Sequence, residues 1–207
     1  MGVAHVARCG PRRDAVAMST YTPSRRVDQR RIYNPLQKDA VTFLETSAES
    51  DGERTLLELE LAPGGGNSLH RHITYTERFD VLEGTLTVEV SGTVQRLAAG
   101  EQAAAPAGAM HRFANETGER VVFRVEVVPG HPGFESALQI SYGLARDGLV
   151  RPDGMPKSLV HAALLIELSE SRVGGLMGLL TPLLKPVAWL ARRRGIDRQL
   201  IERYGVI

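Results

Sequence analysis

The feature that most constrains this chain is a set of three histidines and one glutamate at fixed spacing. His70 and His72 are two residues apart, so in a β-strand both side chains project from one face, about 6.6 Å apart. Glu77 follows five residues after His72, the wrong parity for one straight strand, so a bend must return its carboxylate. His111 can join them only through tertiary pairing. Three neutral nitrogens and one carboxylate suit a divalent transition metal.

Glycines and a proline surround these four residues at regular distances. An H-x-H pair alone is weak evidence for a metal site. Here it lies between Gly64 and Gly84, and His111 follows a second block that starts at Gly100 and contains Pro106-Ala-Gly108. Gly84 permits a tight turn after the Glu77 strand. Pro106 and Gly108 shape a turn that feeds His111 back toward the other ligands.

The two blocks read G-x5-H-x-H-x4-E-x6-G and G-x5-P-x-G-x2-H-x3-N. They resemble the paired signature motifs of the cupin superfamily, as found in small bacterial metal-binding cupins, and every position is filled. The resemblance covers about residues 31–130. It implies an all-β core, a double-stranded antiparallel β-barrel of the jelly-roll type, with a metal inside near one mouth. It further implies that the metal ligands are His70, His72, Glu77 and His111.

Alternating apolar residues independently predict strands in the same part of the chain. In Thr55–Leu61 the leucines at 57, 59 and 61 share one face and two glutamates share the other. Ser91-Gly92 predicts a two-residue hairpin turn. The predicted strands are Val41–Glu45, Thr55–Leu61, Glu77–Glu83, Thr85–Val90 and Val121–Val128.

Beyond Gly130 the pattern becomes helical. Helices are expected at Phe134–Asp147, at Leu159–Leu168 with Ser158 as its N-cap, and in a last short segment capped by Asp197. Residues 158–205 are expected to be helical and to cover apolar surface. The predicted organisation is a mobile basic arm at 1–30, a cupin barrel at 31–130 and a C-terminal α-helical extension at 131–207.

The extension contains an apolar stretch, Val173–Ala191, followed by Arg192–Arg194. Its length approaches a bilayer span, but two prolines, three glycines and Lys185 argue against one. The alternatives are a cover over the barrel mouth, a dimer interface, and peripheral membrane contact through residues 173–194. We expect a homodimer.

Charge is unevenly distributed along the chain. The net charge is +1 overall, with +6 in residues 1–38, −8 in 39–129 and +3 in 130–207. An acidic middle segment argues against nucleic acid as a partner. The one cysteine, Cys9, excludes an intramolecular disulfide and multi-cysteine metal sites. No signal-peptide pattern precedes the barrel, so we expect a cytoplasmic protein, with peripheral membrane association as the alternative.

Strand parity also predicts the walls of a substrate pocket. If Glu77 points inward, Phe79 and Val81 do too, and Phe113 follows His111. These three residues are the predicted substrate-binding residues, although they can equally be barrel core. The apolar walls carry no proton-transfer group; Glu126 or Tyr75 could supply one if it pointed inward.

The first hypothesis for function is a mononuclear metal enzyme acting on a small organic molecule, an Fe(II)-dependent, dioxygenase-like oxidoreductase. Ligand type alone does not select the metal, so Mn, Zn and Ni are also candidates. The alternatives are a non-redox isomerase, lyase or polyketide-cyclase-like enzyme using Zn or Ni, and a non-catalytic ligand-binding cupin. Fold alone does not decide among them.

Overall fold

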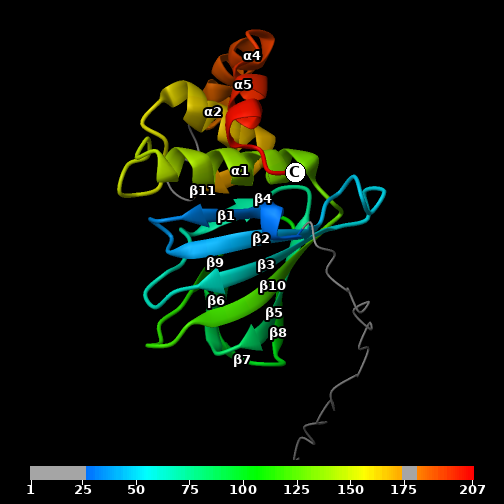
Figure 1. The fold of residues 1–207 in the computed structure, drawn as a ribbon, viewed down its shortest axis with the longest axis vertical. Helices are drawn as coiled ribbons and strands as arrows, with labels where there is room; N and C mark the ends of the chain where they lie inside the picture. Colours follow the sequence, from blue (N-terminus) through cyan, green and yellow to red (C-terminus); the bar gives the residue numbers. More distant parts are fainter. Residues whose placement is uncertain (1–26, 174–180) are drawn as a thin grey trace, which may run out of the picture.

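The computed structural model describes residues 27–173 and 181–207, and its ribbon is drawn in Figure 1. The strands form two antiparallel sheets that face each other below a group of helices. The six-stranded sheet has the order β1 (Arg31–Asn34), β2 (Asp39–Glu45), β3 (Thr55–Leu61), β10 (Val121–Val128), β5 (Thr76–Glu83) and β8 (Gln102–Ala105). The five-stranded sheet has the order β11 (Ser171–Val173), β4 (His70–His72), β9 (His111–Ala114), β6 (Thr85–Val90) and β7 (Thr93–Ala98). The predicted fold class, an antiparallel jelly-roll core with C-terminal helices, is confirmed.

The core lies between the two sheets. Phe43, Leu57 and Phe123 enter it from the six-stranded sheet, and Leu86 and Val88 enter it from the five-stranded sheet; all are fully or almost fully buried. The alternation predicted for β3 is present, since its leucines are buried and its glutamates are half-exposed. The alternation of apolar and polar residues therefore turns the apolar face of each sheet toward one shared interior.

The β6–β7 hairpin confirms its predicted turn. Ser91 and Gly92 both have positive φ, 51° and 81°, which is the backbone geometry that matches the twist of the flanking strands. Val90 pairs with Thr93 across this turn.

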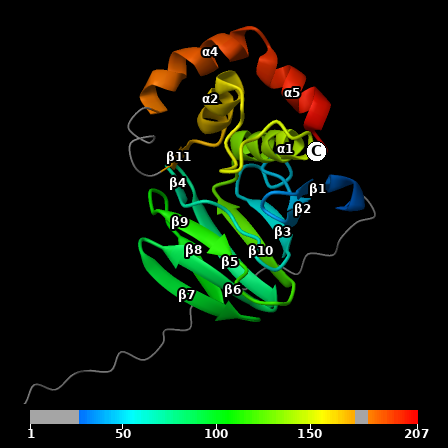
Figure 2. The same cartoon turned by 90° about the vertical axis from the view of Figure 1, so that its left-hand side faces the viewer.

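Within residues 27–173 and 181–207, the α-helices come after β10: α1 (Pro132–Arg146), α2 (Leu159–Leu168), α4 (Lys185–Arg193) and α5 (Ile196–Tyr204). Two short 3-10 turns are η1 (Val27–Arg30), before β1, and η2 (Thr181–Leu184), before α4. Figure 2 shows α1 next to the sheets and α4 and α5 furthest from them. A second apolar cluster, which includes Ile140, Leu144, Leu164 and Leu200, joins these helices.

Buried polar contacts fix α1 to the six-stranded sheet. The Glu135 carboxylate accepts hydrogen bonds from Ser47 N at 2.6 Å, Ser47 Oγ at 3.1 Å and Thr55 Oγ1 at 2.6 Å. The Tyr142 hydroxyl donates to Asp39 Oδ2 at 2.6 Å. Because buried carboxylates need such partners, these two residues tie the extension to the core.

Three sequence-based expectations differ from the structure. Residues 171–173 form strand β11 instead of helix, because their backbone pairs with β4. The last helix is capped by Gly195, with φ 71°, and Asp197 makes no cap hydrogen bond. Residues 27–30, expected in the mobile arm, form η1, and Arg30 bonds to Glu49. Residues 1–26 of that predicted arm lie outside the described residues.

Among the described residues, no helix is long and apolar enough to cross a membrane. The predicted apolar stretch at 173–191 is divided between β11, η2 and α4, and its residues 174–180 lie outside the described part.

Candidate metal centre

Strand pairing brings the four candidate ligands to one point between the sheets. His70 and His72 lie on β4, and His70 pairs directly with His111 on β9. The chain then leaves β4 and enters β5 in the opposite sheet, so Glu77 faces the histidines from across the interior. This change of sheet supplies the bend that the spacing requires.

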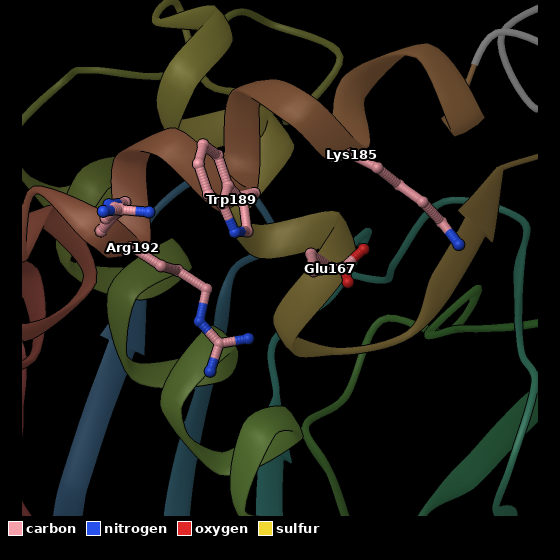
Figure 3. A pocket seen from close by; sticks show the side chains of 5 residues that line it. Glu167, Lys185, Trp189 and Arg192 are labelled. Atoms are coloured by element: carbon pink, nitrogen blue, oxygen red, sulfur yellow. The ribbon is translucent and has the colours of Figure 1, made fainter.

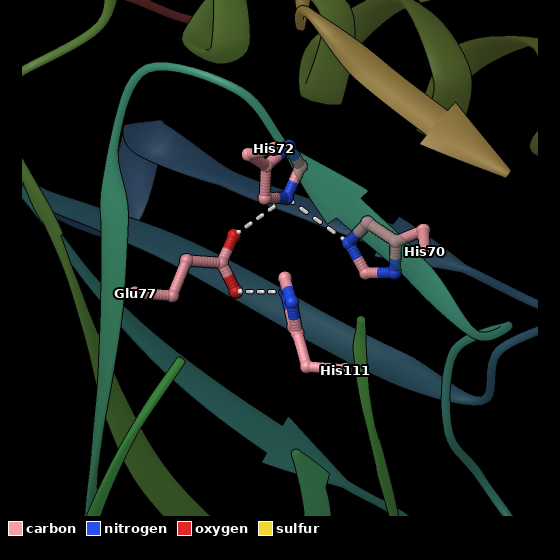
Figure 4. A group of neighbouring side chains, drawn as sticks. All are labelled: His70, His72, Glu77 and His111. Atoms are coloured by element: carbon pink, nitrogen blue, oxygen red, sulfur yellow. Dashed lines mark hydrogen bonds and ion pairs between the residues drawn. The ribbon is translucent and has the colours of Figure 1, made fainter. Parts of the chain in front are cut away.

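The ligand atoms converge closely (Figure 4). The Nε2 atoms of His70 and His72 are 3.0 Å apart. Glu77 Oε1 lies 3.0 Å from His72 Nε2, and Glu77 Oε2 lies 3.3 Å from His111 Nε2. One ligand atom from each of the four residues falls within 4.8 Å of all the others. The cluster could therefore hold a single metal ion.

Backbone carbonyls set the tautomer of two of these imidazoles. His70 Nδ1 is 2.8 Å from Ser68 O, and His111 Nδ1 is 2.9 Å from Ala109 O. A carbonyl oxygen only accepts, so each Nδ1 carries the proton and donates. In the neutral ring the lone pair is then on Nε2, which faces the centre of the cluster.

Tyr75 and Ser171 fix the tautomer and orientation of the third imidazole, that of His72. The Tyr75 hydroxyl lies 2.7 Å from His72 Nδ1 and 2.9 Å from Ser169 O. Because it donates to that carbonyl, its oxygen accepts from His72 Nδ1–H. Ser171 Oγ lies 3.0 Å from the same nitrogen, and the Tyr75 ring stacks on His72 with centroids 4.4 Å apart. His72 therefore also presents its Nε2 lone pair to the centre.

Sequence pattern predicts no role for Ser171 and leaves that of Tyr75 open. Tyr75 is 1% exposed, and its position in a connecting segment gave no sign of this burial. Ser171 comes from β11, 99 residues beyond His72, so no local pattern links the two. A Tyr three residues after the second histidine is the one signal that could have been used.

Electrostatics favour an ionised Glu77 and a neutral His70, the states that metal ligands need, but they favour a proton on His111, which a metal ion would displace. Burial would raise the pKa of Glu77, but the electrostatic interaction with the His72 ring and the proximity of His111 outweigh it, and the pKa lies well below its usual value. Burial, followed by the electrostatic interaction with the His72 ring, lowers the pKa of His70 to about 4. Burial would lower the pKa of His111, but the Glu77 carboxylate outweighs it and the net direction is upward.

One orphaned atom tests whether the residues fit a metal. His111 Nε2 is buried and has no hydrogen-bond partner. A buried nitrogen lone pair without a partner costs free energy, and a cation at the centre would satisfy it together with the other two Nε2 atoms. The donor set fits a divalent transition metal.

A cavity of about 270 Å³ opens beside the cluster. His70, His72 and Glu77 are among the residues that line it. Its other walls come from both sheets, from α1 and α2, and from the segment at 153–156. The apolar part of this lining comprises Val41, Leu57, Leu59, Phe113, Val125, Phe134, Ala137, Leu138, Met155, Pro156, Ala162, Leu165 and Ile166.

Of the three predicted substrate-binding residues, one lines the cavity and two lie in the core. Phe113 lines the cavity. Phe79 and Val81 are 0% and 1% exposed and belong to the core between the sheets, away from the cavity lining. Strand alternation correctly predicted that Phe79 and Val81 point inward. Of the inward-facing residues of β5, however, only Glu77 lines the cavity.

The predicted proton-transfer candidates are engaged elsewhere. Glu126 forms ion pairs with Arg54 at 3.4 Å and Arg78 at 3.0 Å, and the Tyr75 hydroxyl is held by His72 and Ser169. A different pair lies at the cavity wall. Tyr142 lines the cavity and donates to Asp39, whose pKa is raised to about 7, chiefly by burial.

The family comparison agrees with this geometry. The model of the family described as Cupin domain matches residues 57–128. This chain contains a cupin domain. The match spans β3 to β10 and includes all four candidate ligands, which confirms the resemblance to the cupin superfamily.

Solved structures are similar to about half of the chain. The protein TT1209 from Thermus thermophilus is 27% identical, with a TM-score of 0.44, covering 53% of this chain and 98% of its own. An RmlC-like cupin from Shewanella frigidimarina is 20% identical, TM-score 0.45, covering 52% and 90%. KdgF from Halomonas sp. is 17% identical, TM-score 0.42, covering 46% and 82%. No protein among those with curated functions matches the chain.

Proposed function

We propose that this cupin is a mononuclear divalent-metal enzyme acting on a small, largely apolar organic molecule, with Fe(II) and dioxygen as the favoured chemistry. One observation carries the proposal: the same cavity is lined by three candidate ligands and by apolar side chains from the sheets and helices. A reacting molecule in this cavity would touch the metal centre directly. A concave, mostly apolar lining is typical of small-molecule sites.

The lining also limits the substrate. About 270 Å³ lies near the lower end of ligand pockets, which span roughly 300–1,000 Å³. No Lys or Arg is among the described residues that line the cavity, so nothing beside the metal would neutralise a phosphate or a second carboxylate. We therefore propose an uncharged substrate, or one with a single anionic oxygen at the metal end.

In this proposal His70, His72, Glu77 and His111 would hold the ion, and Tyr75 and Ser171 would keep His72 in the correct tautomer. A bound Fe(II) would supply a redox-active ion at which dioxygen and substrate could react, with the organic substrate as the net source of the electrons that reduce dioxygen. The apolar side chains of α1 and α2 would exclude water and orient the substrate. Glu126 and the Tyr75 hydroxyl are both engaged in other contacts, so neither is free to act as the acid or base, which favours redox chemistry over proton transfer.

A second candidate function rests on the Tyr142–Asp39 pair. Tyr142 faces the cavity, and Asp39 behind it has a pKa of about 7. A tyrosine hydroxyl coupled to such a carboxyl can carry a proton near neutral pH. This pair favours a non-redox isomerase or cyclase with Zn or Ni as Lewis acid.

Tyr142→Phe separates the two candidates. Apolar aromatic and aliphatic compounds are screened with protein loaded with Fe(II), Zn or Ni, with and without dioxygen. The proposal expects oxygen consumption that follows iron occupancy and survives Tyr142→Phe. Turnover that is independent of oxygen, highest with Zn or Ni and abolished by Tyr142→Phe would contradict it and establish the second candidate. Tight binding of a compound without turnover under any condition would support the ligand-binding alternative instead.

A further inference from the structure

The outer face of α4 exposes apolar side chains that no described part of the chain covers. Trp189 is 59% exposed and Leu190 is 41% exposed, and Leu183, just before the helix, is 71% exposed. Pro186, Trp189 and Leu190 follow helical spacing on one side, while Ala188 and Ala191 are buried on the other. Exposed apolar groups gathered on one helix face mark an interaction surface.

Cations surround this apolar face. Lys185, Trp189, Arg192 and Arg193 line a surface hollow of about 430 Å³, and Glu167 of α2 is the acidic residue among the described residues that line it (Figure 3). The Arg193 guanidinium lies 5.3 Å from the Trp189 ring centroid. Arg192 is 3.7 Å from Asp197 Oδ2, and the exposed Arg194 follows at the end of the helix. The surface is therefore apolar at its centre and positively charged around it.

We propose that the α4 face, defined as Leu183, Lys185, Pro186, Trp189, Leu190 and Arg192–Arg194, docks on an anionic phospholipid membrane surface. Trp and Leu side chains of an amphipathic helix enter the boundary between headgroups and acyl chains. Lys and Arg next to them pair with anionic headgroups. The hollow lined by three cations is suited to a phosphate-bearing headgroup.

A second copy of the chain fits this face less well. A two-fold interface places the same patch on both sides, so the arginines of one copy would face those of the other, and like charges across an interface are unfavourable. A membrane with acidic lipids is instead complementary to both the charge and the apolar centre. The proposal does not depend on the metal centre or its chemistry.

The chain supplies its own probe, because Trp189 is the only tryptophan in the sequence. Full-length protein is mixed with vesicles of phosphatidylcholine containing phosphatidylserine or phosphatidylglycerol, and with vesicles of phosphatidylcholine alone. We expect Trp189 emission to shift to shorter wavelength, and to be quenched by brominated acyl chains, only with the anionic vesicles. High salt should release the protein, since exposed charge pairs are screened.

Matched variants test the surface while keeping the probe. Leu190→Ser should weaken binding to anionic vesicles, whereas Val94→Ser on β7, also exposed, should not. Arg193→Gln should reduce the partition coefficient about fivefold, the effect of one cation near a charged surface. Arg96→Gln, on β7 at the other end of the molecule in Figure 2, should leave it unchanged.

Three results would overturn the proposal. The first is a Trp189 spectrum that does not respond to anionic vesicles. The second is equal loss in the β7 controls, which would mean non-specific adsorption. The third is a concentration-dependent dimer in sedimentation velocity that Leu190→Ser dissociates, with no vesicle binding by either form; that result would assign the α4 face to a second copy of the chain.

Discussion

At the scale of single residues, His72 depends on groups outside the ligand set. Its Nδ1 hydrogen bond to the Tyr75 hydroxyl fixes the ring and directs Nε2 to the centre. We predict that Tyr75→Phe lowers metal affinity by about 10- to 100-fold, the usual effect of removing a partner of a ligating histidine, and that adding Ser171→Ala lowers it further. Competition with a chelator measures this. Tyr33→Phe, at an exposed position, is the control; equal affinities for both variants would contradict the role given to Tyr75.

Asp39 provides a pH-dependent test of burial. Its pKa rises from 3.8 to about 7 on folding, chiefly because burial disfavours the charged form. The folded state then binds the proton more tightly than the unfolded state, so stability from this group is full below about pH 4 and is lost as the pH rises through about 7. The loss is on the order of 4 kcal/mol.

Asp39→Asn cannot titrate. We predict that the unfolding free energy of the wild type, relative to this variant, falls between about pH 4 and about pH 8, as measured by urea denaturation. Comparing the two proteins removes the contribution of the other titrating groups. A difference that stays constant with pH would show that Asp39 titrates normally in the folded protein.

At the scale of elements, the sequence predicts those strands and helices whose structure is determined by residues close together in the chain. β3, β6 and β10 have the predicted bounds because alternation and turn residues act within a few positions. Ser158 caps α2 as expected, accepting from His161 N at 3.4 Å. Strand β11 could not be predicted, since three residues carry no period and their conformation comes from pairing with β4. The candidate ligands could be predicted from the spacing of the motif. The helical walls of the cavity could not, because they form only when α1 and α2 pack on the sheets.

Glu135 attaches α1 to the six-stranded sheet through buried hydrogen bonds. Glu135→Ala would leave Ser47 N–H and the Thr55 hydroxyl buried without an acceptor. We predict a loss of about 2 kcal/mol or more in unfolding free energy, the cost of buried groups left unpaired. Glu53→Ala, at an exposed position, should change stability little. A Glu135→Ala protein as stable as that control would show that α1 is held by apolar packing alone.

At the scale of the whole molecule, the sheets supply the candidate ligands and the helical extension supplies part of the wall of the adjacent cavity. Ala162 of α2 lies at the cavity wall and is 6% exposed. We predict that Ala162→Phe fills the cavity and abolishes binding of a small apolar probe, while metal content stays unchanged because no ligand is touched. Loss of both together would mean that α2 supports the metal centre itself.

The metal centre is tested by the metal content of protein purified without a polyhistidine tag. Four converging ligands predict about one divalent transition metal per chain by elemental analysis. His72→Ala should lose most of it, and His70→Ala/His111→Ala should lose essentially all, because three nitrogens and one carboxylate together complete the donor set. His161→Ala, which changes a histidine outside the cluster, should keep it. Full metal occupancy in the double variant would contradict the assignment of this centre.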